Sequence, residues 1–167
     1  MFEELGSGAV AKVYRGTYNG EACAIKRLRF LSKEQRRTLT KEYSVLKRLT
    51  HKNIINVKTF IPTEDALILE LCGIKSNNRE IIDVKQWAQN VTKNEKKPDF
   101  GVFHQIFDGL SYLHNNNVLH CDLKSANCLV TGSMNCPIVK LADFGIAYFE
   151  AVTQTETQMS QVCDFFT

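Results

Sequence analysis

The sequence reads His-Cys-Asp-Leu-Lys-Ser-Ala-Asn at residues 120–127 and Asp-Phe-Gly at residues 143–145. A strand-like stretch, Ile138 to Leu141, lies between the two. Both stretches are rich in polar and charged side chains beside apolar ones. They decide the fold only in combination with the elements that precede them along the chain.

The composition is that of an ordinary globular protein. The chain has 167 residues, of which 44% are hydrophobic and 23% are charged, so a disordered, collagenous or coiled-coil chain is excluded. This length suits one domain or two small lobes. The formal net charge of +3 is too small to indicate nucleic-acid binding, and we expect no nucleic-acid partner.

The sequence also carries information about the compartment. Ala66 to Ile74 is too short for a membrane span and is interrupted by Glu70, and residues 1–4 do not resemble a signal peptide. The cysteines contain no C-x-x-C pair, which favours reduced thiols over a zinc site or a disulfide framework. We therefore expect a cytoplasmic protein without a membrane span. The six cysteines are Cys23, Cys72, Cys121, Cys128, Cys136 and Cys163.

The first half of the chain predicts a small antiparallel sheet and one helix. Residues 10–26 alternate apolar and polar side chains around Asn19-Gly20, the strongest short signal for a hairpin. Helical periodicity follows over residues 32–49. Two short apolar stretches, residues 54–61 and 66–71, predict further strands of the same sheet.

Glu42 falls on the apolar face of the predicted helix. An unpaired carboxylate there would carry a large desolvation cost, so we expect a cation from another element to reach it. Lys26, at the end of the second hairpin strand, is such a cation, and the pair would hold Lys26 toward phosphate oxygens. The alternatives are a rotated helix that exposes Glu42 and a strand lysine that points into water.

The second half predicts a mainly helical region. The texture changes near Gly73, where we expect the boundary between a sheet-rich part, residues 1–72, and a helical part, residues 73–167. Helices are predicted at about 82–92 and 99–116. The second predicted helix has an apolar face, expected to lack part of its cover, that consists of Phe103, Ile106, Phe107, Leu110 and Leu113.

A glycine-rich turn precedes the predicted hairpin. Gly6-Ser7-Gly8-Ala9-Val10-Ala11 matches the pattern G-x-G-x-x-G/A, which alone fits a dinucleotide-binding turn, a hairpin over phosphates or an ordinary flexible turn. A dinucleotide site requires a helix to begin at the glycines, whereas this turn leads into predicted strands. The dinucleotide-binding turn is therefore disfavoured, and the phosphate-covering hairpin and the ordinary flexible turn both stay open.

Taken together, these features make the chain resemble the protein kinase family. Residues 120–127 match the family's H-R-D-L-x-x-x-N signature with Cys121 in place of arginine, and Asp143-Phe144-Gly145 matches D-F-G. The glycine turn, Lys26 and Glu42 occupy the remaining signature positions in the family's order. The resemblance implies an α+β, bilobal, protein-kinase-like fold, with a small antiparallel-sheet N-lobe containing one helix and a partial, mainly helical C-lobe.

The resemblance also implies roles for the polar residues. Asp122 would orient the substrate hydroxyl and accept its proton, Lys124 would lie beside the γ-phosphate, and Lys26 would be held by Glu42. Asn127 and Asp143 would bind Mg²⁺. A lysine two residues after the aspartate is typical of Ser/Thr kinases, so we expect ATP-dependent transfer to Ser or Thr of a protein substrate.

The nucleotide site implied by the resemblance lies between the two lobes. Gly6 and Gly8 would cover the phosphates, and Leu69 would lie at the back of the adenine pocket. The Glu70 carbonyl and the Cys72 amide would hydrogen-bond the adenine edge. The side chains expected to sandwich the adenine are those of Val13, Ala24 and Leu129.

Two features depart from the family pattern. Cys121 removes the arginine that pairs with a phosphorylated activation loop in most members, so we expect different regulation. The sequence ends at Thr167 without an A-P-E motif, which predicts an incomplete catalytic domain. The Cys121 replacement and its flanking run most resemble the tyrosine-kinase-like group.

The alternative function is a non-enzymatic, pseudokinase-like module that binds nucleotide or partner kinases and signals by interaction. The complete set of catalytic residues favours the enzyme. A small-molecule kinase that shares the fold is a more distant alternative.

Overall fold

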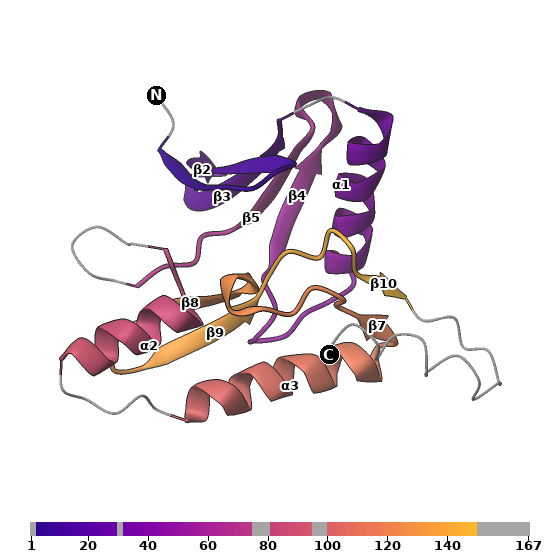
Figure 1. The fold of residues 1–167 in the computed structure, drawn as a ribbon. Helices are drawn as coiled ribbons and strands as arrows, with labels where there is room; N and C mark the ends of the chain where they lie inside the picture. Colours follow the sequence, from indigo (N-terminus) through magenta and orange to yellow (C-terminus); the bar gives the residue numbers. More distant parts are fainter. Residues whose placement is uncertain (1–2, 30–31, 75–80, 95–99, 150–167) are drawn as a thin grey trace, which may run out of the picture.

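The computed structural model describes residues 3–29, 32–74, 81–94 and 100–149. A sheet with a helix at its side forms one part, and two helices with small sheets form the other (Figure 1). This α+β arrangement agrees with the fold predicted from the sequence.

The larger sheet has five strands, all antiparallel to their neighbours. The predicted stretch 54–61 is a regular strand only from Val57 onward, and a 3-10 turn, η1 (Pro62–Glu64), leads from it into the next strand. In spatial order the strands are β1 (Glu4–Ser7), β2 (Ala11–Tyr18), β3 (Glu21–Leu28), β5 (Ala66–Glu70) and β4 (Val57–Ile61).

The predicted hairpin is confirmed. Tyr18 pairs with Glu21, and the two residues between them, Asn19 and Gly20, have φ angles of 51° and 80°. Positive φ at both central positions defines a type I′ turn, whose twist matches that of the flanking strands. The turn sets the β2–β3 register, which in turn fixes the face of the sheet on which Lys26 lies.

The predicted helix is α1 (Lys33–Leu46), which lies beside β4 (Figure 1). Ser32 caps it by accepting a hydrogen bond from the Gln35 backbone N–H. The helix ends three residues before the predicted limit of 49, because the amides of Arg48 and Leu49 bond to carbonyls three residues back and tighten the last turn.

The second part contains both predicted helices, α2 (Val84–Lys93) and α3 (Gly101–Asn115). Asp83 and Gln86 form a capping box at the start of α2. Only β9 (Pro137–Leu141) among the accompanying strands was predicted. A three-stranded sheet has the order β6 (Ile82–Asp83), β8 (Cys128–Gly132), β9, and a two-stranded sheet pairs β7 (Val118–Leu119) with β10 (Tyr148–Phe149).

The predicted apolar face of α3 is only partly covered. The helix packs against β9 with Val102, Gly109 and Leu113, which are buried. Phe103 and Phe107, two members of that face, are 51% and 66% exposed. Helical periodicity indicates that one side of the helix is apolar, but the neighbouring strand selects which part of that side is covered.

A buried polar network joins the two parts. The Asn53 side chain, fully buried, donates hydrogen bonds to the Val139 carbonyl and to the Gln105 side chain, at 2.9 and 3.0 Å. The Ile55 amide donates to the Leu141 carbonyl, and the Leu141 amide to the Asn53 carbonyl, both at 2.9 Å. These bonds hold β9, which leads directly into Asp143, against the segment that precedes β4.

Two further features bear on the sequence predictions. Within the described ranges, no helix is long and apolar enough to cross a membrane. The five cysteines that the structure describes are free thiols, and Cys163 lies outside the described residues.

Candidate functional site

Lys26 lies at the centre of the site. Its Nζ donates to both carboxylate oxygens of Glu42 on α1, each at 2.8 Å, and to Oδ1 of Asp143, also at 2.8 Å. The cation predicted for Glu42 is therefore present, and neither the exposed lysine nor the rotated helix is observed. The contact with Asp143 joins the sheet to the Asp-Phe-Gly stretch.

Burial controls the charge state of this pair. Glu42 is only 2% exposed, and burial raises the pKa of its carboxyl group, while the hydrogen bonds from Lys26 oppose that shift. Burial would lower the pKa of Lys26, but Glu42 and Asp143 outweigh it and raise the pKa above its ordinary value. Lys26 is thus held as a fixed cation.

Asp143 is presented to the space beside Lys26. Its backbone is in the left-handed region, with φ of 63°, and its side chain is 49% exposed. Burial alone would raise the pKa of its carboxyl group, but the Lys26 ammonium group holds it below the ordinary value. The next residue, Phe144, is fully buried and anchors the stretch.

His120 is a structural residue. The Asp122 amide donates to its Nδ1 at 3.2 Å, so Nε2 carries the proton and donates to the Ala142 carbonyl at 3.0 Å. Burial lowers the pKa of the ring, and its centroid lies 4.7 Å from that of Phe144. A buried, neutral imidazole whose two nitrogens are both bonded to backbone has no role as a base.

Asp122, Lys124 and Asn127 form a second polar cluster. Lys124 Nζ and Asn127 Nδ2 donate to Asp122 Oδ2 at 2.7 and 2.8 Å, and Asn127 Nδ2 also donates to the Asp122 carbonyl at 2.8 Å. The Ala142 amide donates to the Asn127 carbonyl at 2.8 Å. This bond ties the loop that carries Asp122 to the residue before Asp143.

The glycine turn leads from β1 into β2, and this geometry excludes a dinucleotide-binding turn, which requires a helix at that point. Within the turn the Gly8 amide donates to the Ala11 carbonyl at 2.9 Å. A Cβ at Gly6 would meet nothing within 4 Å, and one at Gly8 only a carbonyl at 3.6 Å. Neither glycine is therefore enforced by crowding at its Cβ position.

The residues predicted to line the adenine pocket come from four strands. Ala24 on β3 lies opposite Leu69 on β5, Val13 lies on β2, and Leu129 lies on β8. Cys72, just after β5, is buried, which raises the pKa of its thiol to about 12.

Glu70 has a role that sequence reasoning missed. Its carboxylate accepts the Asn56 amide at 2.7 Å and pairs with Lys140 of β9 at 2.8 Å. It therefore ties the end of β5 to the strand that leads into Asp143. The sequence carries no signal for this pair, because its partners are brought together only by packing.

The donor set fits a cation held jointly with phosphates. Asn127 uses its amide nitrogen for Asp122, which leaves its side-chain oxygen to bind a cation, and Asp143 offers a half-exposed carboxylate. Among the residues that the structure describes, no group of three or more His, Cys, Asp and Glu could hold a metal ion. Mg²⁺ suits such a site, since it usually combines one or two protein ligands with phosphate oxygens and water.

Comparison with known proteins identifies the family. The sequence profile described as "Protein kinase domain" matches residues 1–165. The chain belongs to the protein kinase family. Its relatives include the cytokinesis protein sepH of Aspergillus niger, 35% identical over 86% of this chain, and cell division control protein 7 of Schizosaccharomyces pombe, 36% identical over 86%. MAP3K epsilon protein kinase 2 of Arabidopsis thaliana is 34% identical over 87%.

This kinase chain spans only a small part of those relatives, namely 10% of the sepH protein, 13% of the fission yeast protein and 10% of the plant protein. The names of these relatives do not test the predicted tyrosine-kinase-like subgroup, which stays a prediction. Cys121 is exposed, with φ of 63°, and partial burial raises the pKa of its thiol. Most of the predicted activation segment, residues 150–167, lies outside the described residues.

Proposed function

We propose that this chain is the nucleotide-binding and catalytic part of a Ser/Thr protein kinase that uses ATP and Mg²⁺. The observation that carries the proposal is the position of Lys26, which bonds to Glu42 and Asp143 at once. A buried cation held between a helix carboxylate and the aspartate of Asp-Phe-Gly is suited to bind the phosphates of ATP.

The phosphate site would be formed by residues from both parts of the fold. Lys26 would neutralise the α- and β-phosphates beneath Gly6 and Gly8. Asn127 and Asp143 would hold Mg²⁺, which supplies charge neutralisation between the phosphates during transfer.

The adenine site would lie between β2, β3 and β8. Val13, Ala24 and Leu129 would contact the two faces of the base. The Glu70 carbonyl and the Cys72 amide would hydrogen-bond its edge, where backbone groups impose no side-chain requirement. We assign nucleotide binding mainly to residues 1–72 and catalysis to residues 73–167.

Asp122 would act on the acceptor. Its carboxylate would orient a serine or threonine hydroxyl and take the proton of that hydroxyl. At the same time the hydroxyl oxygen would bond to the γ-phosphorus, and the bond from that phosphorus to the bridging oxygen of the leaving ADP would break. Lys124, at 2.7 Å from Asp122 Oδ2, would neutralise charge on the transferred group. The substrate is therefore a protein with an accessible serine or threonine, and the expected compartment is the cytoplasm, where free thiols persist.

The nucleotide site is tested by a thermal melt with and without Mg²⁺-ATP. Saturation at about 100 times Kd adds about 2.7 kcal/mol to the free energy of unfolding, which raises Tm by roughly 5–11 °C. We expect the Mg²⁺-dependent shift to disappear in Asp143→Asn and to persist in Asp108→Asn, a matched change at an exposed aspartate of α3. A cooperative melt without any nucleotide shift in the wild type would refute the nucleotide site.

Catalysis is tested separately by transfer of labelled phosphate to peptides that differ only in a Ser, Thr or Tyr acceptor. We expect transfer to Ser and Thr that is lost in Asp122→Asn, while the nucleotide-induced Tm shift remains. A nucleotide shift without transfer would instead support the non-enzymatic binding module.

A further inference from the structure

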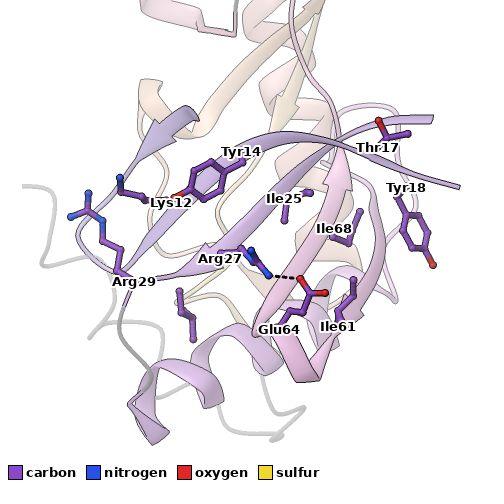
Figure 2. Close-up of a pocket in the computed structure, with 11 residues that line it drawn as sticks. Lys12, Tyr14, Thr17, Tyr18, Ile25, Arg27, Arg29, Ile61, Glu64 and Ile68 are labelled. Atoms are coloured by element: carbon purple, nitrogen blue, oxygen red, sulfur yellow. Dashed lines mark hydrogen bonds and ion pairs between the residues drawn. The ribbon is translucent and has the colours of Figure 1, made fainter. Parts of the chain in front are cut away.

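A second recess lies on the other face of the five-stranded sheet. The strand register places Val13, Lys26 and Leu67 side by side across β2, β3 and β5. Because neighbouring residues of a strand point to opposite faces, the next row, Tyr14, Ile25 and Ile68, lies on the face opposite to Lys26. An open cavity of about 950 Å³ lies over this row, and we call it the outer groove (Figure 2).

The outer groove has an apolar floor. Tyr14 and Ile25, which are partly exposed, and Ile68, which is only 2% exposed, form a continuous row across three strands. Ile61 of β4 lies further along the groove (Figure 2). An antiparallel sheet that faces water normally presents polar side chains on that side. A contiguous apolar floor within a recess is instead typical of a surface that receives another molecule.

The charges around this floor are mainly positive. Lys12, Arg27 and Arg29 line the outer groove, against one lining carboxylate, Glu64. In Figure 2 Lys12 and Arg29 lie together at one end, beside Tyr14, and Arg27 lies nearer the middle, bonded to Glu64.

These cations are available to a partner. Lys12 pairs with Glu4 and Arg27 with Glu64, and in both pairs the two side chains are about one-third to one-half exposed. Exposed ion pairs contribute little stability, so exchanging either carboxylate for one from a partner costs little. The Arg29 guanidinium donates to the Ser7 hydroxyl, and together with Lys12 it lowers the pKa of Glu4, so this end of the groove carries two cations against one carboxylate.

We propose that the outer groove is a docking site for an acidic segment of a partner protein that carries an apolar anchor side chain. The anchor would lie on Tyr14, Ile25 and Ile68, and flanking carboxylates would contact Arg27, Arg29 and Lys12. The site is separated by the thickness of the sheet from Lys26. Docking there leaves the nucleotide site free, and the proposal stands whether or not the chain transfers phosphate.

The test uses a fluorescent peptide, Glu-Glu-Phe-Leu-Glu-Glu, and measures its binding to the purified chain by anisotropy. Arg27→Glu reverses a charge in the outer groove, and Tyr14→Ser removes part of its floor. The matched charge control is Lys52→Glu, because Lys52 is also an exposed cation paired with a carboxylate but lies away from the groove. The matched floor control is Tyr148→Ser, at a half-buried tyrosine of β10.

We expect the peptide to bind, with affinity that falls as salt is added, and we expect Arg27→Glu and Tyr14→Ser each to weaken binding by at least about fivefold. Both control variants should bind within about twofold of the wild type. Thermal melts of all four variants verify that each is folded, and a variant that does not fold is replaced by Arg27→Gln or Tyr14→Leu.

Several results would overturn the proposal. Absence of binding would do so, as would equal binding of the peptide Lys-Lys-Phe-Leu-Lys-Lys, or equal weakening by Arg27→Glu and Lys52→Glu. Sedimentation that shows self-association abolished by Arg27→Glu would assign the groove to a second copy of the chain instead of an acidic partner.

Discussion

Replacing Lys26 by methionine tests the electrostatics of the site most directly. The change keeps an apolar stem of similar length and removes the cation that donates two hydrogen bonds to Glu42. Glu42 is 2% exposed, so its charge then lacks the partner that compensates for burial. Burial already raises the pKa of Glu42 in the wild type, and without Lys26 nothing from that side chain opposes the shift.

The sign of the effect follows from proton linkage. A carboxyl group with a folded-state pKa above its unfolded value binds more protons when folded, so stability is greatest at low pH and is lost as the pH rises toward the folded-state pKa. The slope approaches about 1.4 kcal/mol per pH unit above the unfolded pKa of about 4.3. In Lys26→Met the ammonium group that holds down the pKa of Asp143 is also absent, so burial raises that pKa as well. This shift has the same sign as that of Glu42 and does not reverse the slope.

The assay is Tm against pH, between about pH 5 and pH 7, for Lys26→Met and the wild type. Across this window the variant should lose up to about 3 kcal/mol relative to the wild type, or about 5–11 °C in Tm. The double variant Lys26→Met/Glu42→Gln carries a neutral isostere at position 42 and should show a clearly shallower slope, to which Asp143 alone contributes. Lys26→Met/Glu34→Gln, which changes an exposed glutamate of the same helix, should keep it. Identical pH profiles for Lys26→Met and Lys26→Met/Glu42→Gln would refute the reasoning.

Two further changes test how the site is held in place. Glu70→Ala removes the carboxylate that accepts the Asn56 amide and pairs with Lys140. We expect urea unfolding to show a loss of about 2 kcal/mol in the free energy of unfolding. The double variant Lys140→Met/Glu70→Ala should lose the same amount as Glu70→Ala alone. Additive losses would contradict the pairing. Gly132→Ala places a Cβ 2.7 Å from a backbone carbonyl oxygen, at a residue with φ of 89°, and should lower the free energy of unfolding by about 1–3 kcal/mol. Gly6→Ala, with open space at its Cβ, should leave the free energy of unfolding unchanged. Equal losses in the two variants would contradict this prediction.

Local signals account for the elements that the sequence predicted correctly. Asn19-Gly20 allows positive φ at both turn positions, and this property belongs to the two residues themselves. The periodicity of α1 and the burial of Glu42 also follow from spacing along one helix. The cation for Glu42 was predicted because a buried carboxylate requires one, a requirement independent of the rest of the fold.

The failures concern contacts between distant segments. The apolar face of α3 was predicted, but which of its residues are buried was not: β9 packs on the side that carries Val102, and a helical pattern cannot show where a neighbouring strand lies. The Glu70–Lys140 pair was missed for the same reason. Neither partner lies in a recognisable motif, and their approach depends on how β5 and β9 pack together.

The sequence by itself determined the β2–β3 hairpin, the helices, the family motifs and the need for a cation at Glu42, because each depends on residues close together in the chain or on the chemistry of one side chain. Only the tertiary structure brought Lys26 to Asp143, 117 residues further along, and placed the outer groove on the opposite face of the same sheet. Alternation along each strand assigns its residues to one face of the sheet or the other. Which residues lie side by side on each face depends on the register across β2, β3 and β5, and that register is set by packing of the whole domain.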